Sequence, residues 1–218
     1  TLLNTMFGLE FAVSAGRCTR GIYAQLLPTT HRADLPFDYM LVLDSEGLRA
    51  HELSDQNYEH DNELATLVIG FADLALINIK GENTTEMTSV LQIVAHAFLR
   101  MKLADSPHKR KCMFVHQNVS AVNVKEKLAV DRQKLQEQLD TMTKQASVAQ
   151  GLAEAITSFN RIISFDSNQD VVYFPDLWHG TPPMATVKQD YSMQALETQQ
   201  RILMAISQNF SQCITVPD

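Results

Sequence analysis

The stretch DYMLVLDSEGL, from Asp38 to Leu48, decides how the rest of this chain is interpreted. The five apolar or aromatic residues 39–43 predict a buried strand. Asp44 and Gly47 follow that strand in the pattern D-x-x-G. The order is typical of nucleoside-triphosphate hydrolases, in which a strand-ending aspartate meets Mg²⁺ and a glycine N–H meets the γ-phosphate. An aspartate at a strand end can equally be a cap or a turn former, so the pattern needs support from elsewhere.

A polar segment upstream supplies that support. Thr19 lies 25 positions before Asp44, between Arg17 and Arg20. A threonine at such a place can give its hydroxyl to Mg²⁺ and its N–H to the γ-phosphate, ordering its loop while that phosphate is bound. A lone threonine in a polar loop is usually a turn or capping residue. Its pairing with Asp44 and Gly47 favours the nucleotide-binding interpretation.

The loop that would cradle the phosphates is not visible, since no segment reads G-x-x-x-x-G-K-[ST]. The chain opens on TLLNTMFG, which has the pattern of a helix already under way, with Gly8 as its stop. We therefore expect an N-terminally truncated domain whose preceding residues carried the phosphate loop. Because such loops supply much of the affinity, the 218-residue chain alone is expected to bind nucleotide weakly and to be inactive.

Composition excludes several other classes of protein. With 45% hydrophobic and 20% charged residues the chain can bury a sizeable core. The net charge of −7 argues against nucleic acid as a partner, because phosphate contacts need clustered Lys and Arg. No apolar run approaches the roughly 18 residues of a membrane span, so no membrane partner is expected. The three cysteines are widely spaced, which favours neither a disulfide framework nor a zinc site.

Apolar patterning predicts short strands that alternate with amphipathic helices. The expected strands are 22–27, 39–43, 74–79, 112–115 and 171–174, and the expected helices are 1–8, 62–71, 87–103, 124–155 and 189–210. This alternation indicates an α/β fold with a mostly parallel sheet flanked by helices. We treat residues 1–218 as one domain, within which the highly charged segment 123–155 is expected to be an exposed helical insertion.

In a parallel sheet, ligands bind beyond the carboxyl ends of the strands. The loops after Leu43, Ile79, Val115 and Phe174 should therefore line one crevice. The Val115 loop begins with His116, Gln117 and Asn118, and an amide there can read the edge of a purine because it both donates and accepts. An asparagine that ends a strand in a turn is an equally good interpretation.

For two further residues, the sequence is compatible with either a functional or a structural role. Glu46 is either a second carboxylate behind the metal site or a solvated turn residue. Trp178 could stack near a base, although a lone tryptophan is more often a partly buried anchor.

Longer blocks of the sequence resemble one family. The segment LLNTMFGLEFAVSAGRCTRG (2–21), the blocks LDSEGLRA (43–50) and HDNELAT (60–66), and ADLALINIKGEN (72–83) look like the interferon-inducible very large GTPases. FVHQN (114–118) and YFPDLW (173–178) look the same, so the resemblance covers most of the chain. These proteins are distant relatives of the guanylate-binding and dynamin-like large GTPases.

The resemblance implies a P-loop NTPase-type G domain that binds GTP with Mg²⁺, in a very large protein of the cytosol and also of the nucleus. Thr19 matches the switch I threonine, and Asp44 with Gly47 matches the switch II D-x-x-G. Thr19 and Asp44 would therefore be the Mg²⁺ ligands. Glu46 matches an acidic residue of the guanylate-binding relatives. Self-association through the switch face, giving a homo-dimer, is a further expectation from these relatives.

The chain also departs from the usual pattern of such domains. His116, Gln117 and Asn118 stand where the guanine-reading [NT]KxD motif is expected, which puts guanine specificity in doubt. Leu48 stands where small GTPases place the glutamine that orients water. Any catalysis would then rely on Arg17, Arg20, the missing phosphate loop or a partner in trans. Our hypothesis is that Arg17 or Arg20 stabilises the transition-state charge in cis.

Two functions follow. The first is GTP binding and hydrolysis by the G domain of a very large GTPase. The alternative is a degenerate G domain that serves as a nucleotide-gated or nucleotide-free scaffold for other proteins. The unusual H-Q-N segment favours the scaffold, and the intact Thr19, Asp44, Glu46 and Gly47 favour the enzyme.

Overall fold

The computed structural model describes residues 2–12, 21–32, 34–48, 58–81, 85–104, 110–119, 125–152, 156–181 and 183–208. In chain order the described elements are α1 (Leu2–Phe7), β1 (Ile22–Pro28), β2 (Tyr39–Ser45), α2 (Tyr58–Phe71), β3 (Leu74–Lys80), α3 (Thr85–Leu103), β4 (Lys111–Gln117), α4 (Lys125–Ala149), the short 3-10 helix η2 (Phe159–Arg161), β5 (Val171–Tyr173), β6 (Trp178–His179), β7 (Thr186–Val187) and α5 (Gln189–Ser207). The expected strands and helices are confirmed, with ends that differ by a few residues. Gly8 ends α1 with a φ of 65°, a conformation that glycine adopts without strain.

A three-stranded parallel sheet, in the order β3-β4-β5, forms the centre of the molecule. Strand β4 lies in the middle and pairs with β3 along its whole length, from Lys111 beside Leu74 to Gln117 beside Lys80. β5 is short and pairs only with the second half of β4, with Val172 beside Val115. All three strands therefore end at the same edge of the sheet.

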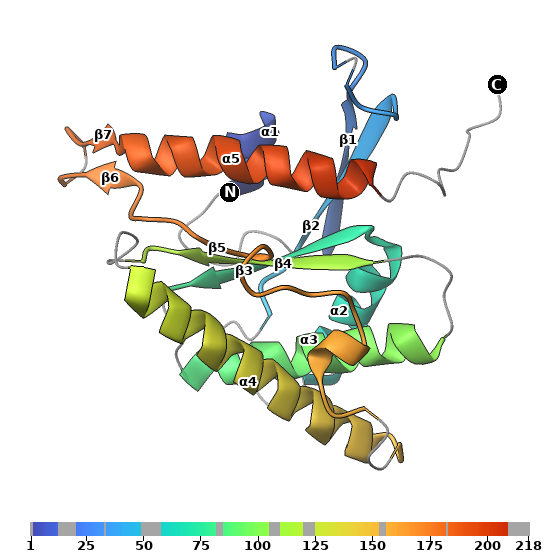
Figure 1. Ribbon diagram of the computed structural model, residues 1–218. Coiled ribbons are helices and arrows are strands. Elements are labelled where there is room, and N and C mark those ends of the chain that lie inside the picture. The colour runs from blue at the N-terminus through green and yellow to red at the C-terminus, as the bar shows by residue number, and fades with distance from the viewer. Residues whose placement is uncertain are drawn as a thin grey trace, which may run out of the picture.

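Side chains alternate along β4 between two helical layers, because successive residues of a strand point to opposite faces. Cys112 and Phe114 join a core cluster with α2, α3 and α4, whereas Met113 and Val115 join a second cluster with α1 and α5. Figure 1 shows this arrangement, with α5 and α1 on one side of the sheet and α3 and α4 on the other. The strand is buried on both faces, as expected for a central parallel strand.

Strands β1 and β2 form a separate antiparallel ribbon, so the sheet prediction was too simple. Met40 and Val42 of the ribbon pack in a third cluster with Leu9, Phe11 and, from α5, Leu203. Among the described residues β2 is hydrogen-bonded to β1 and not to the parallel sheet. The carboxyl end of β2 is therefore not held at the common strand edge by sheet pairing.

Helix α4 corrects the expectation of an exposed excursion at 123–155. Leu135 and Leu139 are completely buried, and both belong to the core cluster that contains α3. The apolar residues that face this core recur along the helix: Leu128, Leu135, Leu139, Met142 and Ala146. They form one stripe at helical spacing. The sequence prediction considered the average polarity of this segment, which is high because α4 carries many charged residues. The structure shows that one face of the helix is part of the domain core.

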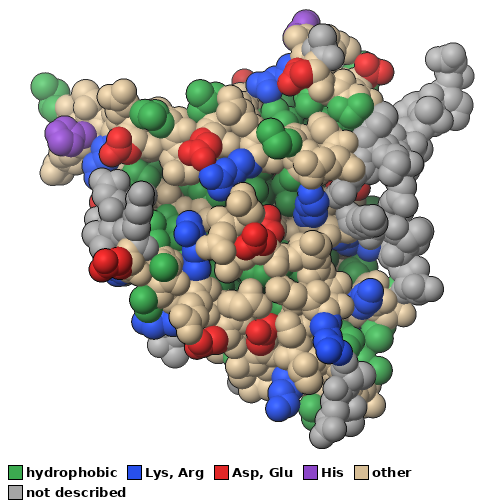
Figure 2. Space-filling view, viewed as in Figure 1, with side chains coloured by type: hydrophobic (Ala, Val, Ile, Leu, Met, Phe, Trp, Pro, Cys, Tyr) green, Lys and Arg blue, Asp and Glu red, His purple; other side chains and the backbone are tan. Residues whose placement is uncertain are grey.

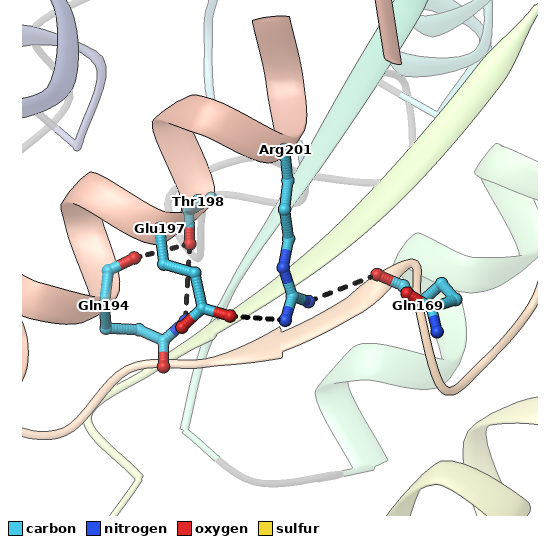
Figure 3. A network of polar contacts seen from close by, with 5 residues as sticks. All are labelled: Gln169, Gln194, Glu197, Thr198 and Arg201. Atoms are coloured by element: carbon cyan, nitrogen blue, oxygen red, sulfur yellow. Dashed lines mark hydrogen bonds and ion pairs between the residues drawn. The ribbon is translucent and has the colours of Figure 1, made fainter. Parts of the chain in front are cut away.

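Helix α5 is attached to the turn that leads into β5 (Figure 3). Arg201 donates to the carbonyl of Gln169 at 3.5 Å and to the carboxylate of Glu197, one turn earlier, at 2.6 Å. Thr198 is buried, and its hydroxyl donates to the carbonyl of Gln194 at 2.7 Å. The exposed ion pair adds little stability by itself. The contact between Arg201 and Gln169 joins the helix to the turn before β5.

The visible surface mixes charges of both signs with scattered hydrophobic side chains, several of which lie over α5 (Figure 2). Met193, Leu196 and Met204 are the exposed large apolar residues of that helix. No helix within the described ranges is long and apolar enough to cross a lipid bilayer.

Candidate functional site

Hydrogen bonds beyond the strand ends hold three loops together. The N–H of Gly81, after β3, donates to the carbonyl of Gln117 at 2.6 Å. The N–H of Val119, after β4, donates to the carbonyl of Phe174, after β5, at 2.9 Å. The Gln117 amide also donates to the Asn78 side chain at 2.6 Å. The loops after β3, β4 and β5 therefore meet at one edge, as the sequence predicted for three of its four loops.

Two adjoining clefts open at this edge. The larger, about 500 Å³, is lined by Gln117, Asn118, Asp176, Leu177, Trp178, Gly180 and Tyr191. The smaller, about 230 Å³, is lined by Asn78, Ile79, Lys80, Gln117 and Asn118. Gln117 and Asn118 line both clefts. The loop after β2, which was expected in the same crevice, does not contribute a described residue to either.

The three residues predicted to read a base are divided by the pleat of β4. His116 continues the face of Phe114, is 1% exposed and stacks on Tyr173 with ring centroids 5.0 Å apart. Its Nδ1 lies 3.2 Å from the carbonyl of Gly81, and Arg132 of α4 lies over the Tyr173 ring. Gln117 and Asn118 instead line the clefts. The structure thus brings the two amides to the cleft and places His116 in the core behind it.

Burial makes His116 a source of pH-dependent stability. Desolvation lowers the pKa of His116 below its ordinary value of 6.5, although the Gly81 carbonyl and the nearby Asp131 carboxylate act in the opposite direction. The unfolded chain therefore binds more protons than the folded chain as the pH falls below about 6.5. This stability is present above that pH and is lost as the pH falls through the lower pKa of the folded state.

We expect the free energy of unfolding to fall between pH 7.5 and pH 5.5, and the His116→Phe variant to show a shallower decline. A remaining slope is expected because burial also lowers the pKa of His96. Urea unfolding at a series of pH values measures this pH dependence for the unmodified 218-residue chain and for the His116 variant. His179→Phe, at an exposed position, is the matched control. Equal slopes in the His116 variant and the unmodified chain would contradict the prediction.

Asn118 has a left-handed backbone, with a φ of 57°. Asparagine tolerates this region better than most residues, and such conformations cluster at ligand sites. The residue is exposed at the rim of both clefts, so its amide is available to a ligand. Its place at the end of β4 agrees with the turn interpretation as well as with the ligand-reading one.

The D-x-x-G segment begins with the last two residues of β2, Asp44 and Ser45, and ends at Gly47. Asp44 is half-buried opposite Tyr23 of β1, and its single carboxylate suits Mg²⁺, which takes one or two carboxylates together with waters and phosphate oxygens. Gly47 is exposed, and no described atom lies within 4 Å of the position that a Cβ would occupy. Packing within the described chain therefore does not require glycine here. A close approach of a ligand to this backbone would require it.

Glu46 is a buried carboxylate that ties three segments together. It is 4% exposed, and its Oε2 accepts a hydrogen bond from the N–H of Gly21 at 2.8 Å. Its own N–H donates to the Gly21 carbonyl at 2.9 Å. Oε1 lies 3.2 Å from Nε2 of His60, in the first turn of α2. The interpretation of Glu46 as a solvated turn residue is therefore wrong, because the side chain links the D-x-x-G segment to the start of β1 and to α2.

Glu46→Ala is expected to lower the free energy of unfolding by about 1–3 kcal/mol, because the part-buried Gly21 N–H loses its charged acceptor. Glu46→Gln keeps an oxygen acceptor and should cost less. Urea unfolding of the 218-residue chain compares both with Glu63→Ala, which removes an exposed glutamate from α2. The contribution assigned to Glu46 is refuted if its alanine variant is no less stable than the Glu63 variant.

The predicted switch residues Arg17, Thr19 and Arg20 lie outside the described residues. Asp176 was missed by sequence reasoning although it lines the larger cleft. A signal was available, since Asp176 follows the apolar run VVYF much as Asp44 follows its own strand.

The structure defines an α/β domain with clefts at its strand ends, and comparison with known proteins gives its class. Residues 1–192 match the family model of the URGCP-like GTPase domain. The chain belongs to this family of GTPase domains.

Its relatives include very large proteins. The chain is 48% identical to mouse interferon-induced very large GTPase 1 over 211 residues and 46% identical to the human protein over 210, covering 95% of this chain and 8% of each relative. It is 32% identical to bovine up-regulator of cell proliferation over 216 residues, or 97% of this chain and 23% of that protein. The resemblance seen in the sequence is confirmed. The chain spans less than a tenth of the length of the very large GTPases.

Proposed function

We propose that this domain binds GTP with Mg²⁺ and hydrolyses it. The observation that carries the proposal is the larger cleft at the carboxyl ends of β4 and β5, whose lining combines apolar and aromatic side chains with two amides. Its volume of about 500 Å³ lies within the range of roughly 300–1,000 Å³ that ligand pockets occupy. Leu177, Trp178 and Tyr191 would hold the faces of a base, and Gln117 and Asn118 its polar edge.

The D-x-x-G segment would serve the phosphate end of the nucleotide. Asp44 would hold the metal ion together with Thr19, and the N–H of Gly47 would face the γ-phosphate. A bound Mg²⁺ would supply positive charge that neutralises the charge developing on the phosphate oxygens. Glu46 would keep this segment in place through its contacts with Gly21 and His60. Self-association through the same segment is the accompanying proposal, drawn from the resemblance to large GTPases.

The test uses the full-length protein, with GTP binding measured by calorimetry and phosphate release measured by a coupled assay. We expect GTP to bind in Mg²⁺ and to be hydrolysed, and binding to weaken strongly in EDTA. Light scattering with and without GTP tests self-association. If no nucleotide binds under any condition, the proposal is refuted.

The second candidate is a nucleotide-gated scaffold. The H-Q-N segment, which stands in place of the usual guanine-reading motif, favours this candidate. Within that segment, His116 is buried and does not line the cleft. The same experiment separates the two. GTP binding without measurable phosphate release, in the presence of Mg²⁺, would favour the scaffold.

A further inference from the structure

One carboxylate reaches the larger cleft, and the proposed function gives it no role. Asp176 is the only acidic residue among the described residues that line this cleft. It lies three positions after the end of β5 and lines the same cleft as Asn118, which follows β4. The strand ends bring these two residues to one cleft although they are 58 positions apart in the chain.

The segment of Asp176 is held from the side of α5. Lys188, directly before that helix, donates its N–H to the carbonyl of Leu177 at 2.9 Å, and its Nζ lies 3.7 Å from Asp176 Oδ2. The Asp176 side chain is 57% exposed. An ion pair of this kind contributes little, so the carboxylate can exchange it for a ligand at small cost. The backbone contact meanwhile keeps the residue at the cleft.

A carboxylate in a base-binding cleft discriminates between purines. Its two oxygens only accept hydrogen bonds. The edge of guanine presents two adjacent donors, N1–H and the 2-amino group, which such a pair of oxygens can bind side by side in charge-assisted bonds. Adenine presents an unprotonated N1 at the same place, and a carboxylate facing that lone pair is repelled. Amides such as Asn118 and Gln117 can adapt to either base, so they do not supply this discrimination.

We propose that Asp176 is the residue that selects guanine, by accepting hydrogen bonds from N1–H and the 2-amino group of the base. Asn118, which lines the same cleft, donates to the carbonyl oxygen O6, and Trp178 packs on the face of the ring. The inference rests on the proposed function, since it assumes that the larger cleft takes the base of GTP. It assigns guanine selection to the segment after β5 and not to the H-Q-N segment after β4.

The test changes the hydrogen-bonding groups of both the protein and the base, by replacing Asp176 with Asn and guanine with xanthine. Xanthine keeps N1–H but carries a carbonyl in place of the 2-amino group, so an asparagine at 176 could accept from one and donate to the other. In the full-length protein with Mg²⁺, we measure the binding of GTP, XTP, ITP and ATP to the unmodified protein, to Asp176→Asn and to Asp190→Asn. Asp190 is an exposed aspartate in the first turn of α5 outside the cleft lining, and it serves as the matched control.

The unmodified protein and the Asp190 variant should both prefer GTP, with ITP weaker because it lacks the 2-amino group. Asp176→Asn should lose at least about 100-fold in GTP affinity and gain about 10-fold or more in XTP affinity. If Asp176→Asn keeps the GTP preference, the inference is overturned while the proposed function stands. Equal loss of all four nucleotides by a variant with an unchanged circular dichroism spectrum also overturns it. If the unmodified protein binds none of them, both the inference and the proposed function fail.

Discussion

Replacing Asp44 with Asn is expected to lower kcat for GTP hydrolysis by at least about 100-fold. Removing one group that stabilises charge in a transition state usually lowers kcat by about this factor. Asn keeps the size of the side chain and the half-buried position at the end of β2, but it has no negative charge for the metal ion. The Mg²⁺ concentration needed for half-maximal GTP binding should rise in the same variant. Phosphate release and Mg²⁺ titrations on the full-length protein measure the two effects.

Asp38→Asn provides the matched control for that experiment. Asp38 is exposed and directly precedes β2, so the substitution changes the same charge near the other end of the same strand. It should leave both kcat and the Mg²⁺ dependence close to those of the unmodified protein. An Asp44 variant that hydrolyses GTP as fast as the Asp38 variant would remove Asp44 from the proposed metal site.

Phe159→Ala should lower the free energy of unfolding by about 3–5 kcal/mol, the usual cost of removing a buried aromatic ring. Phe159 is completely buried, and its ring meets Phe98 of α3 and Phe165 edge to face, with centroids 5.8 and 5.6 Å away. Its N–H donates to Asp140 of α4 at 2.8 Å. The short helix η2 thus closes the layer of α3 and α4, and an empty space at its centre cannot be filled by small movements.

For a domain of this size the loss corresponds to a fall in Tm of roughly 6–20 °C. Phe71→Ala makes the same substitution at the end of α2, where the side chain is 76% exposed, and should change stability by no more than about 0.5 kcal/mol. Urea unfolding of the 218-residue chain, followed by circular dichroism, compares the two. Similar midpoints for both variants would contradict the packing role assigned to Phe159.

Local patterns were sufficient to predict most elements of the fold. Strand β4 is a short apolar run bounded by polar residues, and α3 and α5 carry apolar residues at helical spacing. Helix α4 was misjudged because its charged residues outnumber the one buried stripe that contains Leu135 and Leu139. A stripe of this kind has meaning only once a partner is known, and here the partner is α3.

The antiparallel pairing of β1 with β2 was also beyond the sequence. Each strand was predicted, but pairing depends on which strand the chain brings alongside, and this is a property of distant contacts. As a result, Asp44 lies on the antiparallel ribbon, whereas the larger cleft lies at the strand ends of the parallel sheet.

The segment H-Q-N shows the same limit at the scale of single residues. The sequence predicted that all three side chains lie at the end of a strand. Because successive residues of a strand point to opposite faces, His116 lies in the core and Gln117 lines the cleft. Which of two alternating positions faces a ligand depends on which helical layer the ligand site adjoins, and no local pattern contains that information.

The sequence by itself determined the α/β class, the D-x-x-G segment and the resemblance to very large GTPases, because these depend on residue types at short spacing. The tertiary structure alone decided that Asp176 and Asn118 share a cleft and that Glu46 is buried against Gly21 and His60. The physical reason is that strand pairing and helix packing join residues far apart in the chain, and the free energy of those contacts is not encoded in any one segment.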